Sequence, residues 1–146
     1  MKKLVIMRGI PGCGKSTYVR TQLQGAKVFS ADDWFMRSGK YDFKPQEIGQ
    51  AHEHCFRRFM QAVQKGEPRI VVDNTNTHLW EMSPYILAGD SYDYVIEIIE
   101  VQCDPAVAAE RGIHGVPTHI ISRMHSDMMA QTTQMPPWWI RTVVEN

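Results

Sequence analysis

The sequence predicts an α/β fold in which about five parallel strands form one sheet, with helices on both faces of that sheet. Short apolar runs of strand length alternate with segments of helical periodicity along the 146 residues, which is the pattern of strand–helix–strand units. The runs also end in polar residues, as strands do at the ligand-binding edge of an open sheet. The length fits a single domain over residues 1–146, with a core that needs no disulfides.

The predicted strands are continuous apolar runs, as expected of strands that are buried on both faces. The first of them, residues 4–7, lies between charged residues and is followed by Gly9. Further strands are predicted at residues 28–30, 70–72 and 94–101, and residues 139–144 can add a last edge strand.

Helices are predicted between these strands from apolar periodicity and from start and stop signals. Gly25 ends the first helix, and Gly66 ends a long amphipathic second one. Pro84 bends or divides the third helix, and Asp104 before Pro105 is typical of the N-cap of the fourth. The predicted helices cover residues 15–24, 45–65, 78–88, a segment from residue 105, and residues 117–129, and the predicted loops cover residues 36–44 and 112–116.

Composition limits the classes of function. Sixteen basic and sixteen acidic residues give a formal net charge of zero, which argues against a protein that coats long nucleic acid. Recognition of a nucleotide or of a nucleic-acid end needs only a few local cations and stays open. The three widely spaced cysteines are typical of reduced intracellular thiols. No apolar run has the length of a secretion signal or a membrane span, so we expect a cytoplasmic protein with no membrane partner. No stable protein partner can be deduced.

Residues 9–16, Gly-Ile-Pro-Gly-Cys-Gly-Lys-Ser, match the phosphate-binding loop (P-loop) pattern without a mismatch. In such a loop, backbone N–H groups surround a phosphate and the glycines allow its close approach. Lys15 can reach the β- and γ-phosphates, and the Ser16 hydroxyl can bind Mg²⁺. The predicted contacts with ATP or another NTP come from Gly9, Gly12, Cys13, Gly14, Lys15, Ser16 and Thr17.

Acidic residues follow the second and third predicted strands. One of the two residues Asp32 and Asp33 is expected where an acceptor hydroxyl would meet the γ-phosphate, and a carboxylate there can orient that hydroxyl. An N-cap of a short helix is an equally good interpretation of this pair. Asp73 has the position of the acidic residue on the magnesium side of P-loop proteins. Three short polar residues follow it that can bond phosphate or the acceptor, or cap the next helix, namely Asn74, Thr75 and Asn76.

Four segments occur in the same order and at similar spacing in one known family. They are Gly9 to Thr17, Ser30-Ala31-Asp32-Asp33, Asp73-Asn74-Thr75-Asn76 and Arg111-Gly112-Ile113-His114-Gly115-Val116-Pro117. These segments resemble the polynucleotide kinase branch of the P-loop kinases, which phosphorylates 5′-hydroxyl ends of DNA or RNA. The kinase-like domains associated with ubiquitin-ligase-binding proteins are similar over more of the chain, about residues 4–129. The resemblance implies a three-layer P-loop NTPase fold of the nucleotide-kinase type, with a mobile lid around residues 110–116.

The resemblance also implies roles for single residues. Asp32 matches the general base that acts on the 5′-hydroxyl. Arg111 matches the lid arginine that bridges to the transferring phosphate, and an arginine fork suits phosphate oxygens. Arg123 is either a second lid cation or a surface residue, and the role of Trp138 and Trp139 stays open.

The sequence departs from the phage polynucleotide kinases at two positions. Those enzymes carry an arginine shortly after the acidic pair, where this chain has Trp34 and Phe35, and Arg37 comes slightly later. Their extra lid arginine falls near Val107. Aromatic and basic residues between positions 34 and 44 can stack an unpaired base and hold a phosphate, or can form a packing cluster. A small acceptor therefore stays open beside a polynucleotide.

These observations predict ATP- and Mg²⁺-dependent transfer of phosphate to the 5′-hydroxyl end of a polynucleotide. Lys15 and Arg111 would act on the phosphates, and Ser16 and Asp73 on the metal. The predicted acceptor contacts are Asp32, Asp33, Asn74, Thr75, Asn76 and Arg37. One alternative is a small-molecule kinase that acts on a nucleoside, a sugar or a sugar nucleotide. A second is an ATP-binding module that switches a partner surface, although a pure switch needs neither Asp32 nor Arg111.

Overall fold

Five parallel strands form one sheet in the computed structural model, which describes residues 1–146 apart from the side chain of Ile113. The strand order is β2-β3-β1-β4-β5, and Leu4 of the central strand is paired with Ile70 on one side and Ile96 on the other. The predicted α/β fold is therefore confirmed. The strands are β1 (Lys3–Arg8), β2 (Lys27–Phe29), β3 (Arg69–Asp73), β4 (Val95–Gln102) and β5 (Arg141–Glu145).

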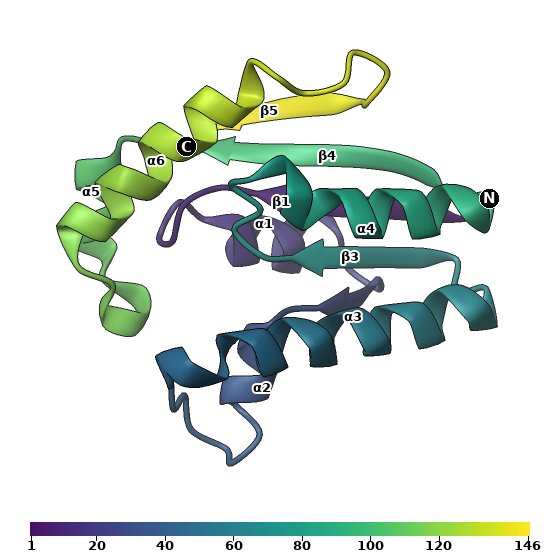
Figure 1. Cartoon of the computed structure of the whole chain (residues 1–146), viewed down its shortest axis with the longest axis horizontal. Coiled ribbons are helices and arrows are strands. Elements are labelled where there is room, and N and C mark those ends of the chain that lie inside the picture. Colours follow the sequence, from purple (N-terminus) through teal and green to yellow (C-terminus); the bar gives the residue numbers. More distant parts are fainter.

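Helices cover both faces of the sheet, as Figure 1 shows. They are α1 (Lys15–Gln22), α2 (Asp32–Phe35), α3 (Ile48–Lys65), α4 (Leu79–Ser91), α5 (Pro105–Arg111) and α6 (Thr118–Thr132), with short 3-10 turns at Pro45–Glu47 and Ile113–Gly115. The predicted N-cap of α5 is confirmed, because the Asp104 carboxylate accepts a hydrogen bond from the N–H of Ala106 at 2.8 Å.

The differences from the predicted elements have local causes. α4 runs through Pro84 without a division. Pro84 is exposed, and so is Trp80, whose carbonyl loses its helical N–H partner. The single turn α2 was predicted only as the short helix of the N-cap interpretation, and its first N–H, from Asp32, donates to the Ser30 hydroxyl at 3.1 Å. β5 begins two residues later than predicted because the N–H of Trp139 donates to Pro136 in a turn.

The alternating side chains of β1 face two separate cores. On one face, Leu4 and Ile6 pack with buried residues of α3 and α4, including Phe59 and Tyr85. On the other, Val5 and Met7 pack with buried residues of α1, α5 and α6. Such two-sided burial is the reason why the strands read as continuous apolar runs.

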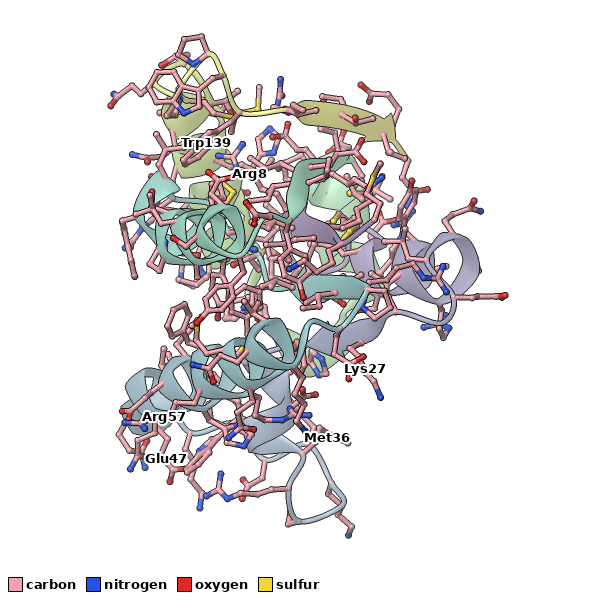
Figure 2. All side chains as sticks on the ribbon, turned by 90° about the vertical axis from the view of Figure 1, so that its right-hand side faces the viewer. Arg8, Lys27, Met36, Glu47, Arg57 and Trp139 are labelled. Atoms are coloured by element: carbon pink, nitrogen blue, oxygen red, sulfur yellow. The ribbon has the colours of Figure 1, made fainter. Side chains whose placement is uncertain are left out.

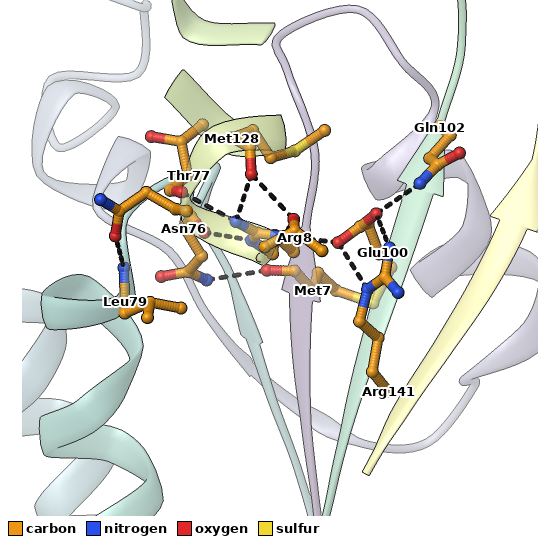
Figure 3. A network of polar contacts seen from close by, with 11 residues as sticks. Met7, Arg8, Asn76, Thr77, Leu79, Glu100, Gln102, Met128 and Arg141 are labelled. Atoms are coloured by element: carbon orange, nitrogen blue, oxygen red, sulfur yellow. Dashed lines mark hydrogen bonds and ion pairs between the residues drawn. The ribbon is translucent and has the colours of Figure 1, made fainter. Parts of the chain in front are cut away.

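A buried polar network links the end of β1 to β4, β5, α6 and the loop after β3 (Figure 3). Arg8 is fully buried, and its guanidinium contacts the equally buried Glu100 of β4 at 2.5 Å. Glu100 also accepts two hydrogen bonds from Arg141 of β5, at 3.0 and 2.6 Å. Arg8 donates further to the carbonyls of Thr77 and Met128 at 2.9 and 3.0 Å, so the network ties β1 to β4, α6 and the loop after β3.

Figure 2 shows Arg8 among the interior side chains, whereas Met36 and Arg57 lie at the periphery.

Burial opposes the ionisation of Glu100, but hydrogen bonds from Arg141, Gln102 and Arg8 outweigh it and lower the pKa of Glu100 to about 2. The pair is therefore charged, and removal of one partner would leave the other charge buried without compensation.

The carboxyl ends of the strands meet at one edge of the sheet, on the left in Figure 1. The loops after β1, β2 and β3 and the segment between α5 and α6 come together at this edge, which is where open parallel sheets bind ligands. Among the described residues, no helix is both long enough and apolar enough to cross a membrane.

Candidate active site

The P-loop, residues 9–16, connects β1 to α1 and has little freedom to move. The N–H of Gly9 donates to the carbonyl of Thr75 in the loop after β3, at 2.9 Å. Gly12 has a φ of 83°, and a Cβ atom there would overlap the carbonyl oxygen of Ala108 in α5. Position 12 therefore needs glycine for its backbone conformation and for space.

The ammonium group of Lys15 lies within the P-loop. Lys15 is 9% exposed, and its Nζ donates to the carbonyls of Gly9 and Ile10 at 2.9 and 3.2 Å. The positive charge is thus placed at the start of α1, where the unpaired N–H groups of a helix also favour an anion. This arrangement suits the triphosphate site that the motif predicts.

Cys13 is fully buried and does not line the cleft beside the P-loop. Burial raises the pKa of the thiol, which keeps it neutral. Its carbonyl accepts a hydrogen bond from the side-chain amide of Asn146 at 2.7 Å, which fixes the peptide between Cys13 and Gly14.

Ser16 and Asp73 provide adjacent oxygen atoms on the floor of the site. The Ser16 hydroxyl donates to Oδ2 of Asp73 at 3.0 Å. Burial raises the pKa of Asp73, while the charge of Lys15 and the bond from Ser16 lower it. A hydroxyl and a carboxylate at this spacing are the hard oxygen ligands that Mg²⁺ prefers beside phosphates, so these residues fit the predicted metal.

Asp32 and Asp33 point in different directions. The Asp32 carboxylate is 53% exposed and lines the same cleft as the P-loop. Asp33 is paired with Arg58 of α3 at 2.8 Å and accepts a hydrogen bond from the N–H of Ser30 at 3.3 Å. The N-cap interpretation does not describe Asp32, because Ser30 receives the first N–H of α2.

The polar residues after β3 have different positions. Asn74 and Thr75 line the cleft, but the side-chain oxygen Oδ1 of Asn74 already accepts a hydrogen bond from the N–H of Ala31 at 2.8 Å. Asn76 is 1% exposed, and its amide donates to the carbonyl of Met7 at 2.7 Å. Its position holds the loop against β1 and does not support the predicted contact with a substrate.

The two predicted arginines lie at the edge of the site or away from it. Arg111, at the end of α5, donates to the Gly12 carbonyl at 2.9 Å, so it contacts the P-loop from the lid side. Arg37 lies over the ring of Trp34 at 3.9 Å and forms an ion pair with Glu47 at 3.2 Å. These contacts hold Arg37 outside the cleft, and they do not support its predicted role in binding the acceptor.

The cleft that these elements enclose has a volume of about 230 Å³. Predicted residues that line it are Gly12, Gly14, Lys15, Ser16, Thr17, Asp32, Asp73, Asn74 and Thr75. Ser30, Tyr41, His52, His114 and Val116 line it as well, and none of them was among the predicted site residues. Local signals were present for four of them: Ser30, His114 and Val116 lie in the segments that carry the family resemblance, and Tyr41 lies in the aromatic and basic stretch between positions 34 and 44. His52 lies inside the predicted helix over residues 45–65.

Comparisons with known proteins agree with this geometry. A family model described as an AAA domain matches residues 4–114 of the chain. The chain belongs to this AAA domain family. The P-loop of such a domain implies NTP binding, and the fold is that of the P-loop kinase-like domains.

Human NEDD4-binding protein 2 is 37% identical over 128 residues, which cover 83% of this chain and 7% of that protein. The chain therefore spans a small part of this relative. A chain in the structure of the Pnkp1/Rnl/Hen1 RNA repair complex has a TM-score of 0.76 at 16% identity, covering 92% of this chain and 46% of the other. A sugar kinase from Janibacter sp. HTCC2649 has a TM-score of 0.60 at 12% identity, covering 99% of this chain and 86% of the other. The two structural similarities concern the fold alone.

Proposed function

We propose that this protein transfers the γ-phosphate of ATP to the 5′-hydroxyl end of a polynucleotide. The observation that carries the proposal is the exposed Asp32 carboxylate, which faces the same cleft as Lys15 and Ser16. An acid in that position can receive the proton of an acceptor hydroxyl while the P-loop holds the triphosphate. A site that only binds a nucleotide does not need a carboxylate at this position.

In the proposed reaction, the acceptor oxygen forms a bond to the γ-phosphorus while the bond between that phosphorus and the β-phosphate oxygen breaks. The hydroxyl proton passes to Asp32, and ADP leaves. Lys15 binds the phosphate oxygens. Arg111 gives up its hydrogen bond to the Gly12 carbonyl and binds the transferring phosphate instead, where its charge stabilises the transition state. When bound, Mg²⁺ at Ser16 and Asp73 neutralises phosphate charge.

The preference for a polynucleotide rests on the family resemblance and on the fold shared with the RNA repair chain. One observation favours the small-molecule alternative. Among the described residues that line the cleft, Lys15 is the single lysine or arginine, and Arg37 is held outside by Glu47. Few cations are thus available for backbone phosphates, and the fold shared with a sugar kinase keeps a smaller acceptor as the second candidate.

Transfer of labelled γ-phosphate to a panel of acceptors tests the proposal. The panel contains 5′-hydroxyl DNA and RNA oligonucleotides, nucleosides and sugars. We expect label on an oligonucleotide, and a loss of about 10²-fold or more in Asp32→Asn with ATP affinity retained. Lys15→Ala should lose ATP binding itself.

Asp42→Asn is the matched control, since it removes the same charge from an exposed residue outside the cleft, and it should keep full activity. Label on a nucleoside or sugar alone would establish the second candidate. ATP binding without transfer to any acceptor would favour the nucleotide-dependent switch.

A further inference from the structure

Three side chains from three separate segments meet at the acceptor side of the cleft. Asp32 is the first residue of α2, Tyr41 lies in the loop after α2, and His114 lies in the predicted lid. The imidazole of His114 is stacked on the Tyr41 ring, with centroids 3.8 Å apart and planes at 26°. Its Nε2 lies 3.8 Å from Oδ2 of Asp32.

His114 has an unfavourable backbone conformation that orients its side chain towards the cleft. His114 has a φ of 70°, in the left-handed region, between Gly112 at 54° and Gly115 at 64°. The two glycines adopt that region freely, but a residue with a Cβ atom does so at a cost. Strain of this kind persists where the surroundings hold it, often at functional sites. Here it directs the His114 side chain back over the cleft.

Tyr41 is the fixed half of the stack. Its ring packs edge-on against Phe35 at 6.2 Å and parallel to Phe43 at 6.4 Å. The N–H of the next residue, Asp42, donates to the Phe35 carbonyl at 2.9 Å. Burial and the nearby charge of Asp32 raise the pKa of Tyr41, so the phenol stays neutral and offers its face to His114.

We propose that His114 is a positioning residue for Asp32, an inference that rests on the proposed function. When the acceptor binds, Nε2–H of His114 donates to one carboxylate oxygen of Asp32, and the other oxygen then faces the acceptor hydroxyl. The 3.8 Å separation is longer than a hydrogen bond, and such contacts tighten in the substrate complex. The stack on Tyr41 holds the ring at the height of the carboxylate.

The position of His114 also couples the phosphate-binding side of the cleft to the acceptor side. Arg111, which contacts the P-loop at Gly12, ends the helix directly before the 3-10 turn that contains His114. A movement that brings Arg111 onto the transferring phosphate therefore moves His114 with it. The acceptor carboxylate is oriented at the same moment as the triphosphate is covered.

Two substitutions separate the hydrogen bond from the stack. His114→Phe keeps an aromatic ring on Tyr41 but has no donor, and we expect kcat to fall about tenfold with the KM for ATP unchanged. His114→Gln keeps a side-chain N–H of similar reach and should retain more activity than the Phe variant. His119→Ala is the control, because His119 is an exposed histidine of α6.

Wild-type kcat in His114→Phe would overturn the proposal, and so would an equal loss in the Phe and Gln variants accompanied by a higher KM for ATP. Amide hydrogen exchange over residues 112–116 provides a readout that does not need turnover. We expect Tyr41→Leu to speed this exchange at least threefold and His119→Ala to leave it unchanged.

Unchanged exchange in Tyr41→Leu would show that the stack does not hold the lid, which would also overturn the proposal. If the wild-type protein transfers no phosphate to any acceptor, the proposed function fails, and the positioning role fails with it. Slow exchange that depends on Tyr41 would then identify the stack as a structural contact. The two failures are therefore distinguishable.

Discussion

Asp32 and Asp33 are neighbours in the sequence, yet their carboxylates have different surroundings. Asp33 is joined to Arg58 of α3, whereas Asp32 faces the cleft. The separation follows from α2, since successive residues of a helix point about 100° apart. The position of the pair after a predicted strand therefore does not identify which member can meet a substrate, whereas the family resemblance pointed to Asp32.

Gly12 permits a prediction at this scale. Gly12→Ala places a Cβ atom against the Ala108 carbonyl at a φ of 83°, while Gly39 has a φ of 92° with no atom within 4 Å of an added Cβ. Both variants carry the same backbone strain of about 1–2 kcal/mol. Gly12→Ala carries an additional cost of about 1–3 kcal/mol for the overlap with α5.

Urea unfolding and ATP titration of both variants measure the difference. We expect Gly12→Ala to lose more stability than Gly39→Ala and to bind ATP more weakly. Equal stability in the two variants would mean that α5 moves away from the P-loop without cost.

At the scale of elements, the Arg8–Glu100–Arg141 network joins the last residue of β1 to the interior of β4 and to the first residue of β5. The three strands are adjacent in the sheet, so their side chains meet although the residues are far apart in the sequence. A buried ion pair contributes little net stability when intact, but its disruption costs several kcal/mol. The network therefore specifies how the strand ends and α6 are arranged.

Stability should depend on pH through Glu100. Its pKa in the folded protein is about 2, against an ordinary 4.5, so the ionised group stabilises the fold above about pH 4.5. This contribution, roughly 3 kcal/mol, is lost as the pH falls towards 2. Urea unfolding of Glu100→Gln and wild type between pH 7 and pH 2 should give a difference in the free energy of unfolding that shrinks over this range.

Glu53→Gln is the control, since Glu53 forms an exposed pair with Arg57 in α3, and such a pair is worth less than about 1 kcal/mol. A stability difference for Glu100→Gln that stays constant with pH would contradict the assignment.

The elements also show what a sequence can predict. The strands and the P-loop were predictable because their signals are local, in continuous apolar runs and in the spacing of Gly9, Gly14 and Lys15. Arg8 was predicted only as a charged residue that flanks the first strand, since its partner Glu100 is 92 residues away. The stack of Tyr41 on His114 was hidden for the same reason. Pairing at long range depends on sheet order, which the pattern does not specify.

For the molecule as a whole, the candidate site joins three parts of the fold. The P-loop and β3 supply the phosphate side, α2 and the loop after it supply the acceptor side, and the segment between α5 and α6 lies above both. Each part packs on the sheet separately, with α3 and α4 on one face and α1, α5 and α6 on the other. A ligand that contacts all three parts would link them.

ATP should therefore stabilise the whole molecule against heat. At a concentration of about 100 Kd, binding adds about 2.7 kcal/mol, which for a chain of this size raises Tm by roughly 5–10 °C. Lys15→Ala should abolish the shift, while Lys27→Ala, at an exposed position of β2, should keep it. A full shift in Lys15→Ala would place the nucleotide outside the P-loop.

The burial of Arg8 also bears on the order in which a growing chain can fold. Arg8 leaves the ribosome 92 residues before Glu100, and Glu100 leaves a further 41 residues before Arg141. N-terminal segments generally begin to fold during synthesis, but the end of the central strand cannot be buried at low cost while its charge has no partner. The end of β1 is therefore expected to be buried only after Glu100 of β4 has emerged, and the network is complete only when Arg141 of β5 follows.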